Sequence, residues 1–366
     1  ILVYFMPEAS GPCRFGQYNV LMKNLIEDRE IEDVAIMSLT STNGYAGLGL
    51  NFRLRAWQAI VTADVLNEIH SAILALSEDR KQAEEIFAKV SDDLFSALAS
   101  KPWRSVKSLM KSKAAELAQI KLKMPLEEAP KVGLTGEVYV RNDKFSRQFL
   151  VEKLAEKNIV TKVSPFNEWM YYIDYLLQNK LLLPQPSFLD RFKNKLEGYY
   201  KRKVEKDVKE IWTESGLYEP HLTDVEEVIE STEGLMSEEL TGETILTIGA
   251  AVDEIIENVH GMIAIGPFGC MPNRVSESII KDTLEKQKEK ITAHVDNELV
   301  SKVLDEFSSL PFLAIEADGN KFPQVIEARI EAFCLQVRRI NEYINTEKEE
   351  VVREEIKEGK LAGEKT

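Results

Sequence analysis

The sequence predicts an α/β protein with parallel sheets, arranged in two domains. Short apolar runs that end at glycine or proline alternate with segments whose apolar residues recur at helical spacing. The length of 366 residues exceeds what one hydrophobic core usually serves. A hydrophobic content of 44% with 29% charged residues is typical of soluble globular proteins.

Six short apolar runs are expected to form the strands, because each has the length of a buried strand and stops at turn residues. They are residues 1–6, 34–39, 137–140, 159–163, 262–265 and 312–315. Apolar stripes at helical spacing between the runs predict the helices. They comprise Val61, Val65, Ile69 and Ile73, then Ile245, Ile248, Val252, Ile255 and Val259, and further apolar positions within residues 324–344.

The domain boundary is expected near Pro130. Residues 82–122 read as helical and free of strands, and residues 124–130 carry two prolines and two glutamates, as a linker does. This gives a first α/β domain with a helical extension (1–130), a second α/β domain (131–350) and a charged tail (351–366). Because the chain opens directly in a strand-like run, we expect it to be part of a longer protein.

Composition excludes several classes of protein. With 46 basic and 61 acidic residues the net charge is −15, which argues against nucleic acid as the main partner. No apolar run reaches the roughly 18–20 residues that span a bilayer, and no secretory leader is evident. We therefore expect a cytoplasmic protein with no membrane partner.

Several common catalytic motifs are missing. The sequence contains no G-x-x-x-x-G-K-[ST], G-x-S-x-G, H-E-x-x-H or C-x-x-C. Gly44, Gly47 and Gly49 follow a predicted strand and could cradle a nucleotide phosphate, although a plain connecting loop explains them as well. Of the four histidines, His260 alone lies just before a predicted strand.

The chain has three cysteines, an odd number that does not suit a disulfide framework. Cys13 and Cys270 have equivalent settings: a strand, a Gly-Pro turn, the cysteine, a nearby arginine and a helix. In a parallel sheet this places both sulfurs past the carboxyl ends of strands, where ligands bind. Cys334 lies in the predicted helix over 324–344, which follows a strand expected in the same sheet as Cys270.

These features favour an iron–sulfur cluster held by Cys13, Cys270 and Cys334. Arg14 and Arg274 are expected to balance its charge, although surface salt bridges are the alternative role. Gly11, Gly266 and Gly269 are expected to shape a cradle in which backbone N–H groups reach the cluster. Two other readings stay open: three reduced, buried thiols, and structural zinc, which usually has four protein ligands.

Three segments resemble the 2-hydroxyacyl-CoA dehydratase superfamily, in the branch related to dehydratase activases and double-cubane cluster proteins. They are Gly-Pro-Cys-Arg-Phe-Gly-Gln-Tyr at 11–18, Gly-Pro-Phe-Gly-Cys-Met-Pro-Asn-Arg at 266–274 and Glu-Ala-Phe-Cys at 331–334. The resemblance covers residues 1 to about 344 and implies flavodoxin-like (Rossmann-like) domains and a [4Fe-4S] cluster on the three cysteines. Some members of this superfamily link two such cubanes into an [8Fe-9S] double cubane.

The resemblance also implies partners. A separate ATP-dependent iron–sulfur activator delivers a low-potential electron, which dehydratases use to expel water from a 2-hydroxyacyl-CoA substrate. This chain carries thiolates for one cubane only, so a double cubane would need a second chain or further sequence, in a homo- or hetero-dimer. The rival hypotheses are a non-catalytic scaffold or regulatory subunit with a structural cluster, and a nucleotide-binding protein that uses the glycine loop at 44–49.

Overall fold

The computed structural model describes residues 1–6, 13–38, 48–181, 188–286, 289–292 and 298–357. It confirms an α/β protein with parallel strands, in two separate sheets. The smaller sheet pairs β1 (Leu2–Phe5) with β2 (Val34–Met37). The larger sheet has the order β4 (Val160–Val163), β3 (Lys131–Gly136), β5 (Met262–Pro267), β6 (Phe312–Ala317).

One predicted strand is wrong. Residues 137–140 do not extend a strand; β3 comes earlier, at Lys131–Gly136, and the helix α5 (Val138–Asn142) follows it. Gly136 ends the strand with a φ of +106°, a conformation that favours glycine. Glu137 then caps the helix, because its carboxylate accepts the N–H groups of Tyr139 and Val140. This cap overrides the strand preference of the Val-Tyr-Val sequence.

The four-stranded sheet is wound in both directions from its middle. The chain passes from β3 outward to β4, then returns across the sheet to β5 and continues to β6. The helices α10 (Glu243–Glu254) and α11 (Met271–Lys286) pack on each other and on β3, β5 and β6. The rule that such crossovers are right-handed predicts α6 (Leu150–Ala155) and α14 (Gln324–Lys357) on the other face. In agreement, Nζ of Lys157, just after α6, pairs with Oε1 of Glu331 on α14 at 2.8 Å.

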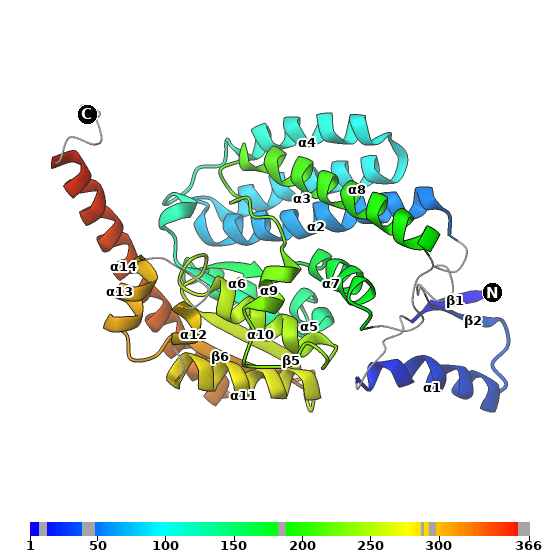
Figure 1. The fold of residues 1–366 in the computed structure, drawn as a ribbon. Helices are drawn as coiled ribbons and strands as arrows, with labels where there is room; N and C mark the ends of the chain where they lie inside the picture. The colour runs from blue at the N-terminus through cyan, green and yellow to red at the C-terminus, as the bar shows by residue number, and fades with distance from the viewer. Residues whose placement is uncertain (7–12, 39–47, 182–187, 287–288, 293–297, 358–366) are drawn as a thin grey trace.

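A layer of long helices lies beside the edge strand β4 (Figure 1). It consists of α2 (Leu50–Leu76), α3 (Arg80–Ser100), α4 (Trp103–Leu117) and α8 (Phe188–Thr213). We assigned α2–α4 to the first domain, yet their buried residues form one hydrophobic core with β3 and β4. The other described elements are η2 (Leu126–Glu128), α7 (Asn167–Gln178), α9 (Val225–Glu230), α12 (Glu289–Thr292) and α13 (Glu298–Glu306).

The helix α2 is long and apolar enough to cross a membrane by length and composition, although no other helix in the described residues is. However, 61% of its most apolar 18-residue window is buried inside the protein, against β4, α3, α6 and α8. This packing is that of a core helix.

The small sheet stands apart from that core. β1, α1 (Phe15–Asp28) and β2 form one β-α-β unit, which lies to one side of the body in Figure 1. All four residues of β1 are exposed, with Leu2 at 66% and Phe5 at 50%. Parallel strands are usually covered on both faces, so this pair differs from the larger sheet, whose β3 is buried throughout.

Buried carboxyls near the larger sheet predict that stability falls as the pH rises. Burial raises the pKa of Glu68, Glu168 and Asp253 to about 7 and that of Glu243 to about 8. Between pH 6.5 and 8.5 the folded protein therefore binds more protons than the unfolded chain. We expect the free energy of unfolding, measured in urea, to decrease by about 2 kcal/mol across this range.

Below pH 6.5 the free energy of unfolding should stop rising as the pH is lowered further. The reason is that burial lowers the pKa of three histidines, so that the unfolded chain binds protons at these histidines more readily than the folded protein does. His70 has a pKa of about 4, and His221 and His260 of about 3. A Glu168→Gln variant should show a weaker pH dependence than the natural protein. Equal or greater stability at pH 8.5 than at pH 6.5 would contradict the prediction.

Candidate functional site

The site is built at the point where the winding of the larger sheet reverses. The neighbouring strands β3 and β5 lead in opposite directions, and in open α/β sheets ligands bind outside the carboxyl ends of the strands at such a point. After β5 the chain makes a tight turn in which the N–H of Cys270 donates to the carbonyl of Pro267 at 3.0 Å. Gly269 takes the left-handed position of this turn, with a φ of +69°. The turn presents Cys270 just beyond the carboxyl end of β5.

Cys270 lies immediately before α11, a helix of 16 residues. Burial is the main influence on its thiol and raises the pKa. The backbone N–H of Asn273 opposes this rise by donating to the sulfur, whereas the carboxyls of Glu243 and Glu137 and the thiol of Cys13 add to it. Burial is thus the first cause of the raised pKa, and two glutamates that the sequence did not suggest add to it.

The loop that carries Cys13 lies against the loop that carries Cys270. The guanidinium Nη2 of Arg14 donates to the carbonyl of Gly269 at 3.3 Å, across 255 positions of sequence. The electrostatic influence of the Cys13 thiol on Cys270 agrees with this contact. Both thiols are partly exposed and free. The structure therefore brings together two of the three cysteines that the sequence analysis grouped.

Cys334 is not part of this group, and the expectation that all three sulfurs meet is wrong. It is 3% exposed and belongs to the hydrophobic core with Phe333 and Val337. Those two neighbours flank Gly261, which precedes β5, whereas Cys270 follows β5. Since α14 begins at Gln324 and rises about 1.5 Å per residue, Cys334 lies about 15 Å along the helix, toward the opposite end of the sheet.

The charges around Cys334 also differ from those around Cys270. Burial and Glu331 raise its pKa to about 11, while Lys157 and Arg338 lower it only partly. Lys157 lies in the turn before β4, at the amino end of that strand. The sequence correctly placed the strand before this helix next to the strand of Cys270, but it did not show how far the helix carries Cys334 away.

The predicted cradle residues have unequal roles. Gly266 lets α11 approach β5, because a Cβ there would meet the side chain of Asn273 at 2.8 Å. Gly269 is open, with the guanidinium of Arg14 as the nearest group at 3.7 Å from a Cβ. Arg274 is half exposed and pairs with Glu277 at 2.6 Å and Glu316 at 3.6 Å. It therefore has the alternative role named above, that of a surface salt bridge. Gly11 lies outside the described residues.

The remaining sequence candidates contribute no site. Gly44 and Gly47 lie outside the described residues, and Gly49 precedes α2 with nothing within 4 Å of a Cβ. His260 is a buried structural residue whose Nδ1 accepts the N–H of Lys131 at 2.9 Å. Its lowered pKa keeps it neutral at physiological pH.

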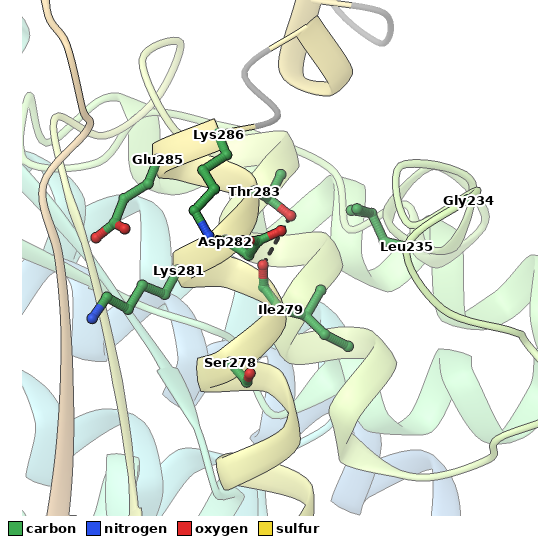
Figure 2. A pocket seen from close by; sticks show the side chains of 9 residues that line it. All are labelled: Gly234, Leu235, Ser278, Ile279, Lys281, Asp282, Thr283, Glu285 and Lys286. Carbon is green, nitrogen blue, oxygen red and sulfur yellow. Dashed lines mark hydrogen bonds and ion pairs between the residues drawn. The ribbon is translucent and has the colours of Figure 1, made fainter.

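A broad hollow lies elsewhere, along the second half of α11 (Figure 2). Its volume is about 520 Å³, and its wall combines Ser278–Lys286 side chains with the turn at Gly234 and Leu235. The charged groups there are surface groups, with Lys286 paired to Asp282 at 2.7 Å. The hollow begins two helical turns beyond Cys270 and provides neither thiol nor imidazole.

The thiols of Cys13 and Cys270 could supply two of the ligands that a metal ion or an iron–sulfur cluster needs. Within the described ranges, no three His, Cys, Asp or Glu side chains gather as metal ligands. Comparisons of the chain with protein-family models, with curated proteins and with solved structures find no match. Function therefore has to be argued from the site itself.

Proposed function

We propose that this chain is an iron–sulfur protein that accepts low-potential electrons, with Cys13 and Cys270 as its thiolate ligands. The observation that carries the proposal is the contact between the segments that hold them, the Arg14–Gly269 hydrogen bond, beyond the carboxyl ends of β3 and β5. Arg14 brings a positive charge to a position where thiolates would be negative, and the N–H of Asn273 already serves the Cys270 sulfur. A [4Fe-4S] cluster there would supply one-electron transfer.

Two thiolates are too few for a cubane, so the proposal requires ligands from a second chain, in a homo- or hetero-dimer. The exposed apolar residues of β1, close in sequence to Cys13, support such a partner. An [8Fe-9S] double cubane would need more thiolates again. The two-domain flavodoxin-like arrangement is part of the proposal, with β1-α1-β2 as one unit and the larger sheet as the other.

The family proposal is the 2-hydroxyacyl-CoA dehydratase superfamily, in a cytoplasmic setting. An ATP-dependent activator would donate the electron, and an acyl-CoA is the proposed substrate class. What supports it is the similar sequence around Cys13 and Cys270, together with the hydrogen bond between their neighbours Arg14 and Gly269. The alternative is a non-catalytic subunit with a structural cluster. One measurement distinguishes it from the proposal: mixing the protein with the reduced activator should bleach the visible spectrum only if the cluster accepts electrons.

Three cysteine variants test the ligand assignment. After anaerobic purification and reconstitution, Cys13→Ala and Cys270→Ala should each lose most of the bound iron and sulfide, by tenfold or more. Cys334→Ala is the matched control and should keep the iron content of the natural chain, because its sulfur lies in the hydrophobic core. Equal iron content in all three variants, or a loss confined to Cys334→Ala, would refute the assignment.

A further inference from the structure

A second cavity lies on the face of the larger sheet that α10 covers, separate from the cysteines. Its floor is a row of three residues side by side on β4, β3 and β5: Lys162, Gly133 and Met262. Gly133 leaves room for the side chain of Met262, because a Cβ at position 133 would lie 2.3 Å from its sulfur. The cavity has a volume of about 80 Å³, room for a few water molecules or one small ligand.

Carboxyl groups line its walls from four different helices. Glu68 comes from α2, Glu168 from α7, Glu227 from α9, and Asp253 and Glu254 from the end of α10; Asp224, the N-cap of α9, adds another. Besides polar groups such as Ser164 and Thr223, the lining has apolar side chains at Val163, Leu222, Val228, Ala250 and Val259. The cavity therefore combines several acidic groups with surface suited to an alkyl chain.

The two basic side chains that line the cavity, Lys162 and His221, leave these carboxyls without a close cation. Lys162 pairs with Glu219 at 3.1 Å, and Lys131 shares the same glutamate. His221, at 4.0 Å from Glu68, is held neutral because burial lowers its pKa to about 3. The cavity has an excess of acidic groups, whose ionised forms favour a cation over an anion.

One carboxyl in the wall points to a missing partner. The side chain of Glu168 is 4% exposed, and its Oε2 has no hydrogen-bond donor. The guanidinium of Arg141 is 3.6 Å away, beyond hydrogen-bond distance, and its Nη1 and Nη2 donate to the carbonyls of Gly136 and Pro165. A buried carboxylate oxygen without a donor is costly, so a ligand that donates hydrogen bonds would relieve it.

We propose that this cavity binds a small primary alkylamine, with the ammonium group on Glu168 and Glu68 and the methylenes on the apolar wall. An ammonium group offers three hydrogen-bond donors and one positive charge, which matches acceptors that are spread around a cavity. A bare metal ion fits less well, because no three ligands converge in the part of the chain that the structure describes. The cysteine site plays no part in this binding.

Binding should release protons. Burial raises the pKa of Glu168 to about 7, against the lowering effect of Arg141, and Glu254 and Asp64 add to the rise. A cation beside Glu168 favours its ionised form, so the proton leaves when the amine arrives. At pH 6.5 the observed heat of binding should therefore depend on the ionisation enthalpy of the buffer.

Isothermal titration of the full chain with 1,4-diaminobutane and butylamine tests the proposal, with magnesium chloride and sodium chloride as comparison cations. We expect saturable amine binding that weakens about tenfold or more in Glu168→Gln. Glu230→Gln is the matched control and should bind as the natural chain does, since Glu230 is exposed on α9 and does not line the cavity.

Three outcomes would overturn the proposal: no heat with either amine, equal affinity in Glu168→Gln and the natural chain, or binding of magnesium in place of amines. Circular dichroism checks that Glu168→Gln is folded, and Glu68→Gln repeats the test from a second wall of the cavity. Since Cys270→Ala should bind amines unchanged, failure of the amine site and failure of the iron site remain distinguishable.

Discussion

Gly136→Ala is expected to destabilise the protein by about 4 kcal/mol or more, enough to unfold much of it at 25 °C. A Cβ at this position would lie 2.1 Å from the carbonyl oxygen of Ile265 and 2.7 Å from its nitrogen. Both contacts are with the backbone of β5, so no side chain can turn away. The φ of +106° adds strain for any residue other than glycine. Urea unfolding followed by circular dichroism measures the effect.

Gly198→Ala provides the control for this change. Gly198 lies within the long helix α8, and nothing is within 4 Å of a Cβ there. Alanine should therefore stabilise the protein by about 0.5–1 kcal/mol, through the lower entropy of the unfolded chain. If Gly136→Ala lost no more stability than about 1 kcal/mol, the close approach of β3 and β5 at the candidate site would be wrong.

Arg141→Met should have the next largest effect, a loss of about 3–5 kcal/mol of unfolding free energy. Its side chain is 1% exposed, yet it donates to the carbonyls of Gly136 and Pro165 and lies 3.6 Å from Glu168. Methionine fills a similar volume but leaves two buried carbonyls without donors and two buried carboxyls, Glu168 and Glu243, without their cation. Urea unfolding at pH 7 measures the loss.

Two further variants separate charge from packing. Arg274→Met removes a half-exposed arginine with two carboxylate partners and should cost at most about 1 kcal/mol. In the double variant Arg141→Met with Glu168→Gln, part of the lost free energy of unfolding should be recovered, because the carboxyl that lacks a cation has been removed. A double variant that is less stable than Arg141→Met alone would show that packing, and not charge, makes Arg141 necessary.

The sheet could be predicted from the sequence because its strands are short, apolar and closed by turn residues. Runs such as 262–265 and 312–315 appear as β5 and β6, paired in parallel. The strand at β3 was misplaced because its sequence, Lys-Val-Gly-Leu-Thr-Gly, is less apolar than the Val-Tyr-Val that follows. The decisive signals, a glycine with positive φ and a glutamate cap, are local geometry that residue preference does not reveal.

The candidate site could be predicted only in part. The sequence correctly predicted that Cys13 and Cys270 each follow a strand, β1 and β5. Cys334 lies within a helix, where position depends on how many turns separate it from the start of the element. Glu137 and Glu243 come from two elements that meet only after folding, and the same holds for the carboxyls of the amine cavity.

The small β-α-β unit has a consequence for the two thiols. None of its residues belongs to the hydrophobic cores of the described chain, whereas Cys270 follows a strand buried in the larger one. The sulfur–sulfur spacing is thus fixed by contacts between surfaces, such as that of Arg14 with Gly269, and can widen without breaking any interior packing. Cys270 is therefore held in place by the interior of the protein, whereas the segment at Cys13 is held by surface contacts.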